Sequence, residues 1–276
     1  MPAPQATLMK QAARLKLTSF NLKVPKGWRD PSGEAGDHYK RAFKSDEKMT
    51  QPGMPMLFQP ASLNKYHTDT QKMHVGKIGS YMDGVCDAIC SAWGQWQGLA
   101  SMTGIVINAI TATLGVVAGP PLQPFILASA PKASPMEMKY SNVIATVVST
   151  TWLQYTATIK VPGMPWYPAF AAFPAPVAPP TPNVPCPVAA LTQVPPNPAL
   201  MKQQMVGQLG DPNAPFHAEL FESICDAFDK MFKLWQTTTM VTNVLGTGPI
   251  PTFAPPYVPV GPVVGGVGNM PPGGFT

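Results

Sequence analysis

Apolar residues recur at steps of three and four in three stretches of the chain. In residues 72–97 the apolar positions are Ile78, Met82, Val85, Ala88, Ile89, Ala92, Trp93 and Trp96. In residues 136–158 they are Val143, Ile144, Val147, Val148, Thr151, Trp152 and Tyr155, and in 216–235 they are Leu220, Phe221, Ile224, Cys225, Phe228, Met231, Phe232 and Trp235. This is the period of an α-helix with one apolar face. The pattern therefore predicts three amphipathic helices.

Between these stretches lie long segments without charge. No charged residue occurs in 88–131, 161–201 or 234–276. The second run is dense in proline, which removes backbone donors, blocks helix and favours extended or polyproline conformations. Helices alternating with such segments predict an α+β or irregular fold. It would consist of two or three short helices in helix-plus-extended units, joined by long Pro/Gly-rich segments.

The apolar window 99–119 allows two interpretations. Its length just reaches that of a membrane-spanning helix. It also contains Ser, Asn, Thr and two glycines and lacks basic flanks, which argues against membrane insertion. The favoured interpretation is a helix that continues into, or is followed by, buried extended segments within an oligomer.

Charge is scarce and unevenly placed. Charged residues make up 12% of 276 residues, whereas Pro (35) and Gly (23) are abundant. A chain that must hydrate its whole surface usually carries about twice that share of charge, so we expect much of this one to be covered by other subunits. Residues 1–77 hold 13 Lys/Arg against 6 Asp/Glu, which predicts a basic extended arm that docks on an acidic neighbouring subunit. We expect this arm, 161–201 and 245–276 to wrap neighbours as straps.

Parts of the sequence repeat. Val85-Cys86-Asp87-Ala88 matches Ile224-Cys225-Asp226-Ala227, and Trp96-Gln97 matches Trp235-Gln236 at the same offset of 139 residues. The stretch after Trp152 resembles the one after Trp235. We therefore expect an arm (1–77), a first repeat unit (78–135), a second unit with a Pro-rich strap (136–210) and a third unit with a Pro/Gly-rich tail (211–276).

The sequence contains none of the familiar catalytic motifs. We predict no catalytic residues, no cofactor-binding residues and no metal site. The four cysteines have no zinc-ligand spacing; we expect buried free thiols, with a disulfide as the alternative. Nucleic acid is not an expected partner, because basic and aromatic residues occupy different parts of the chain. The expected core or oligomer contacts are Trp93, Trp96, Trp152, Trp166, Tyr167, Phe221, Phe228, Phe232 and Trp235.

Low charge, a basic arm, duplicated helical units and Pro/Gly connectors together resemble structural proteins of phage particles and phage-tail-like contractile injection systems. The resemblance implies a non-enzymatic, multi-copy component of a tail, baseplate, collar or cap. Such a subunit would assemble in the bacterial cytoplasm with copies of itself and other particle subunits, and would reside in the virion or injection particle. The alternative is a membrane-active or translocated effector that inserts residues 99–119.

Overall fold

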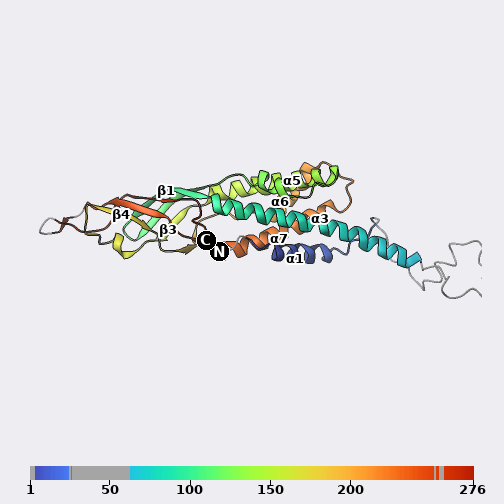
Figure 1. The fold of residues 1–276 in the computed structure, drawn as a ribbon, viewed down its shortest axis with the longest axis horizontal. Helices are drawn as coiled ribbons and strands as arrows, with labels where there is room; N and C mark the ends of the chain where they lie inside the picture. Colours follow the sequence, from blue (N-terminus) through green and yellow to red (C-terminus); the bar gives the residue numbers. More distant parts are fainter. Residues whose placement is uncertain (1–3, 25, 27–62, 252, 255–257) are drawn as a thin grey trace, which may run out of the picture.

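The computed structural model describes residues 4–24, 26, 63–251, 253–254 and 258–276, and shows an elongated molecule with helices at one end and a sheet at the other (Figure 1). The helical half comprises α1 (Ala6–Ser19), α3 (Leu63–Leu99), α4 (Gln123–Ser129), α5 (Pro135–Thr158), α6 (Pro198–Leu209) and α7 (His217–Thr238). The sheet half comprises β1 (Ser101–Asn108), β2 (Thr111–Ala118), β3 (Val161–Pro165), β4 (Val177–Pro182), β5 (Cys186–Pro187), β6 (Met240–Val241), β7 (Leu245–Pro249), β8 (Phe253–Ala254), β9 (Val258–Pro259) and β10 (Gly266–Met270). Two short 3-10 helices, η2 (Pro168–Phe170) and η3 (Val188–Ala190), complete the order. The expected α+β class is correct.

The three predicted helices are present as α3, α5 and α7, but they are not short. Helix α3 has 37 residues and begins at Leu63, so the expected boundary between arm and first unit at residue 77 falls inside a helix. Helix α5 has 24 residues and starts with a capping box, in which the Ser134 hydroxyl accepts from the Glu137 amide and the Glu137 carboxylate accepts from the Ala133 amide. Apolar periodicity finds only the buried part of a helix, which explains the missed first turns of α3.

Six strands form one antiparallel sheet in the order β3-β2-β1-β10-β7-β4. Strands β1 and β2 are a hairpin, and the last strand of the sheet by sequence, β10, pairs with β1 at its centre. All three expected units contribute strands, and one continuous apolar core runs from α1 to Phe275. The expected units are therefore interleaved in space rather than stacked as separate bodies.

Residues 99–119 contain the whole β1–β2 hairpin, so the window is not a membrane-spanning helix. Ile105 and Ile107 are buried on either side of the more exposed Val106, and Met102 is buried on the same side across a break in register, which is typical of a strand with one buried face. Among the residues that the structure describes, no helix is both long enough and apolar enough to cross a bilayer.

The Pro-rich segments were expected to be straps on neighbouring subunits. For the described residues this is wrong, because 161–201 supplies β3 and β4 and 245–276 supplies β7 and β10 of the chain's own sheet. Proline is tolerated there because β3 and β4 are the two edge strands, where a missing N–H removes no ladder bond on the open side.

Glycines on the inner side of the sheet leave room for bulky side chains. A Cβ added at Gly246 would lie 2.5 Å from the Trp166 ring, and one at Gly266 would lie 2.6 Å from Val263. Trp166 and Val263 are buried, and they cover the face of the sheet that is turned away from solvent. Gly246 and Gly266 are therefore packing positions of β7 and β10.

The N-terminal segment is not an extended arm where it is described. Residues 6–19 form α1, which packs on α3 and α7 and buries Met9, Ala13 and Leu17. The physical reason is that the buried stripe of α1 has only four residues, which is a weak periodic signal in the sequence. Four apolar side chains are nevertheless enough to pack the helix against α3 and α7. The remainder of the predicted arm, 27–62, lies outside the described residues.

Candidate functional site

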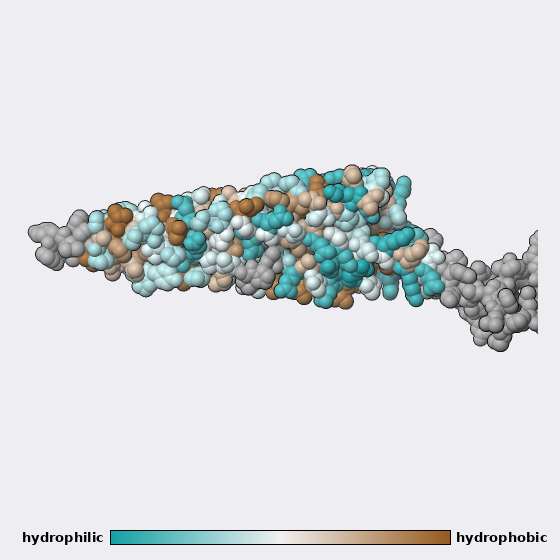
Figure 2. Space-filling model, viewed as in Figure 1, coloured by the Kyte–Doolittle hydropathy of each residue, from teal (hydrophilic) through white to brown (hydrophobic). Residues whose placement is uncertain are grey.

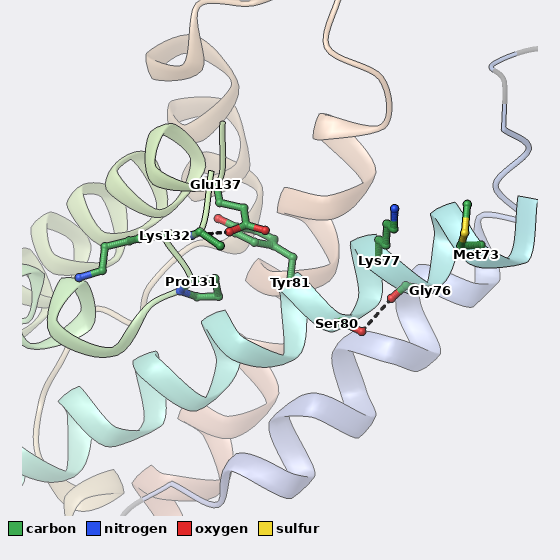
Figure 3. A pocket seen from close by; sticks show the side chains of 9 residues that line it. Met73, Gly76, Lys77, Ser80, Tyr81, Pro131, Lys132 and Glu137 are labelled. Carbon is green, nitrogen blue, oxygen red and sulfur yellow. Dashed lines mark hydrogen bonds between the residues drawn. The ribbon is translucent and has the colours of Figure 1, made fainter. Parts of the chain in front are cut away.

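A pocket of about 670 Å³ opens on the helical half between α3 and the start of α5 (Figure 3). Substrates usually bind in such hollows, so the polar groups around it decide what it can do. The lining comes from two segments, and its members are Met73, Gly76, Lys77, Ser80 and Tyr81 of α3, together with Pro131, Lys132, Ala133 and Glu137.

The polar groups of this pocket serve the local structure. The Glu137 carboxylate accepts from the Ala133 amide at 2.7 Å, the Lys132 ammonium points away and donates to the Leu127 carbonyl at 2.6 Å, and Ser80 donates to the Gly76 carbonyl at 3.0 Å (Figure 3). Burial raises the pKa of Tyr81, whose hydroxyl lies 3.1 Å from that of Ser141. Apart from Lys77, the charged side chains that line the pocket are therefore held in cap and turn contacts of the local structure.

All four cysteines are buried free thiols, as expected. Burial raises the pKa of Cys90 and of Cys225 to about 12 and that of Cys186 to about 11, and it raises the pKa of Cys86 as well. Thiols with such pKa values stay protonated at neutral pH and are poor nucleophiles and ligands. Within the described part of the chain, no three His, Cys, Asp or Glu side chains lie close enough together to hold a metal ion.

The predicted contact residues gather where the helices meet the sheet. Trp152 of α5 lies at the centre, with its ring centroid 4.7 Å from that of Trp93, 4.8 Å from Trp96 and 5.5 Å from Trp235. Gln97 links the cluster to the C-terminal segment, since it accepts from the Trp235 indole and donates to the Phe275 carbonyl. We call this group of four tryptophans the junction cluster.

The other predicted contacts fall into two groups. Phe221, Phe228 and Phe232 of α7 are fully buried, and Phe228 and Phe232 pack on the junction cluster. Trp166 is buried against Phe170 in the sheet half, whereas Tyr167 is 40% exposed. Eight of the nine residues are therefore core of this chain, and Tyr167 alone of the nine reaches the surface.

The basic residues of α1 find their acidic partners within the same chain. Arg14 binds Asp83 through two hydrogen bonds of 3.0 and 2.8 Å, and Lys10 pairs with Asp87 at 2.9 Å. Lys16 pairs with Glu222 of α7 at 2.8 Å. For these three cations the expected acidic neighbour is the protein's own α3 and α7.

The surface of the sheet that faces solvent has a different character. Residues paired in register share a face, so Thr103 lies beside Val116, Val106 beside Thr113 and Val267, and Val267 beside Thr247. Val177 of β4 and Leu245 of β7 are on the same side. We call these positions the outward sheet face: Thr103, Val106, Thr113, Val116, Val177, Leu245, Thr247 and Val267.

This face exposes apolar side chains and carries no charge. Val177 is 56%, Val267 50% and Val116 47% exposed. None of the ten strands contains a charged residue. Figure 2 shows the contrast, with strongly hydrophilic residues over the helical half and pale or hydrophobic ones over the sheet half.

Backbone strain occurs on the same hairpin. Leu114 has a φ of 67° and is 58% exposed, and Ala109, with a φ of 52°, precedes Ile110, which is 49% exposed. A left-handed conformation costs a residue with a side chain roughly 1–2 kcal/mol. In this hairpin the strained residues are Leu114 and the neighbour of Ile110, and both of these large apolar side chains are exposed to solvent. Sequence reasoning did not single out either position.

Comparison with models of protein families, with curated protein sequences and with solved structures found no match for this chain.

Proposed function

We propose that the protein is a non-enzymatic structural subunit of a large symmetric particle, such as a tail, baseplate, collar or cap component of a phage or contractile injection system. The observation that carries this proposal is the outward sheet face. A face that exposes Val177 and Val267 and has no charge of its own is suited to burial against another subunit.

The shape of the molecule supports the same function. Its two halves lie end to end along one axis (Figure 1), and the junction cluster with the single continuous core ties them together. An elongated body that presents charge at one end and an uncharged sheet at the other offers two unlike surfaces. Subunits of layered assemblies need such surfaces, because each layer meets a different neighbour.

Internal duplication forms part of the proposal. Trp96 lies three residues before the end of α3 and Trp235 three residues before the end of α7, and a strand begins two residues after each helix. We infer that the α3–β1 and α7–β6 segments are two copies of one helix-plus-strand unit. The segment from α5 into β3 is a third, less regular copy, because Trp152 lies six residues before the end of its helix.

Residence in a particle formed in the bacterial cytoplasm is testable with the host. Particles sedimented from lysed cells and washed in high salt are examined by mass spectrometry for this protein. We expect it at a fixed ratio to the other particle proteins, and we expect its deletion to leave incomplete particles in electron micrographs. Recovery of the protein only in the soluble fraction, with intact particles in the deletion strain, would refute the proposal.

A further inference from the structure

We propose that the outward sheet face is a self-association surface, covered by the same face of a second copy of this chain. This inference rests on the proposed function and names the partner of its site. Two sheets would pack face to face, with Val106 and Val267 of the two central strands nearest the axis between the copies.

Charge matching selects the partner. A charge buried against this face would lose its hydration and find no counter-ion, because the face has none to offer. The occupant must therefore be uncharged over a comparable area. The chain itself contains such a surface, whereas its helical half carries Lys230, Lys233 and other charges on its outside.

The strained hairpin supports the same direction. Glycine adopts a positive φ without this cost, as Gly115 does at 91°, yet the residue at a φ of 67° is Leu114, which is 58% exposed. Persistent strain of this kind is typical of sites whose conformation serves a function. The same two strands supply Thr103, Val106, Thr113 and Val116 to the outward sheet face, so the strain lies next to the proposed surface.

The edges of the sheet offer no equivalent route. Strand β3 contains Pro162 and Pro165, and β4 contains Pro179, Pro180 and Pro182. These residues cannot donate to an added strand, and edge prolines are a common protection against strand addition. The face, rather than either edge, is therefore the surface through which the sheet half can meet another copy.

The size of the face sets the expected strength. Six strands spaced about 4.8 Å apart and five to eight residues long give a surface of roughly 500 Å² in plan. That is slightly below the area of about 600–1,000 Å² per partner that specific, stable interfaces bury. We therefore expect a dimer that dissociates on dilution, with a dissociation constant on the order of micromolar.

The test is sedimentation velocity of the purified full-length protein over a concentration series, with one variant on the face and one matched control. Val267→Glu adds a charge at the centre of the face, and Leu200→Glu adds the same charge on α6; both side chains are 50% exposed. We expect the wild type and Leu200→Glu to dimerise alike, and Val267→Glu to dissociate at least about tenfold more readily. If Val267→Glu fails to fold by circular dichroism, Val116→Glu replaces it.

A mixing experiment tests whether the two copies use the same face. Val267→Glu and Val267→Lys should each be monomeric alone and should associate when mixed, since the two new charges lie opposite each other. A wild-type protein that is monomeric at about 100 μM, a dimer equally weakened by both glutamates, or a mixture that stays monomeric would each overturn the inference. A monomeric protein found in particles would leave the proposed function standing, whereas a dimer absent from particles would remove the proposed function alone.

Discussion

The two halves of this protein differ in the kind of surface that they present to solvent. The helical half carries most of the charged side chains and pairs several of them internally: Glu222 accepts from both Lys16 and Lys202. No ion pair can form between the described strands of the sheet half, because these strands contain no charged residue. It is built instead from backbone ladders, glycines that admit bulky rings, and exposed Thr and Val side chains.

This difference shows where sequence composition has structural meaning. An average over the chain gives 12% charge and suggests a uniformly poor surface. In three dimensions the deficit is concentrated in one half, so hydration is ordinary at one end and sparse at the other. The contrast predicts that a substitution in the junction cluster lowers the stability of both halves. A substitution that disturbs packing within the sheet should destabilise the sheet half alone, and the loss of an ion pair should destabilise only the helical half.

The largest effect is expected at the junction cluster. Trp152→Ala removes a fully buried ring that contacts Trp93, Trp96 and Trp235, and it should lower the free energy of unfolding by about 3–5 kcal/mol. In urea denaturation, the transition followed by circular dichroism, which reports helix, and the transition followed by tryptophan fluorescence should shift together. Tyr167→Ala, at an exposed ring, is the control and should change little. A change in the free energy of unfolding below about 1 kcal/mol would mean that the junction cluster contributes little to stability. Separate transitions for the two probes would mean that the protein does not unfold as one cooperative unit.

The next effect is confined to the sheet. A Cβ at Gly248 would lie 2.5 Å from the Gly266 Cα, so Gly248→Ala forces two strands apart and should cost about 1–3 kcal/mol. Thermal unfolding checks this. The matched control is Gly163→Ala in β3, where a Cβ would meet nothing within 4 Å. Equal melting temperatures for the two variants would show that the inner face has room to spare.

The sequence predicts the helices better than it predicts the sheet, and the reason is physical. Helical periodicity is local, so the buried faces of α3, α5 and α7 are visible in single stretches of sequence. The outward sheet face joins Val106 to Val267 through register, and no local pattern connects residues so far apart. Proline and glycine also hide strands, since edge positions and packing against rings allow residues that propensity disfavours.

The candidate surface was missed for a related reason. Aromatic residues were expected at core or oligomer contacts, and eight of the nine are in the core, whereas the exposed apolar residues are mostly Val and Leu. Alternation in 101–107 and 111–117 was the available signal. The favoured interpretation of this window included buried extended segments, but it did not identify which of their side chains would face solvent. Similarly, the contact between Gly79 and the Arg14 side chain joins residues far apart in the sequence, so no local pattern reveals it.

Gly79→Ala tests the helical half, because its effect on stability should depend on whether the Arg14 side chain is present. A Cβ at Gly79 would lie 1.8 Å from an Arg14 guanidinium nitrogen, so Gly79→Ala must displace the fork that binds Asp83. Alanine gains about 1 kcal/mol of helix propensity over glycine, which the displaced ion pair should cancel. In an Arg14→Ala background the same change should stabilise by about 1 kcal/mol, as measured by urea denaturation. Stabilisation by the same amount in both backgrounds would show that the Arg14–Asp83 pair contributes nothing.

The smallest effect is a dependence on pH and salt that belongs to the helical half. Lys16 and Lys202 hold the pKa of Glu222 below its usual range by hydrogen bonding, so its stabilisation is complete above the unfolded pKa of about 4.3 and is lost as pH falls through the lower folded value. Because the group is partly exposed, we expect a loss of about 0.5–1 kcal/mol in acid or in molar salt. Glu222→Gln should abolish this part of the acid sensitivity in urea titrations, whereas Glu219→Gln, one turn earlier on α7, should retain it.

Self-association through the outward sheet face should be unchanged by the same salt, because no charge lies on that face to be screened. A dimer that weakens with salt as steeply as the helical half would place charged residues in the interface, and the division between the two halves would then be incorrect.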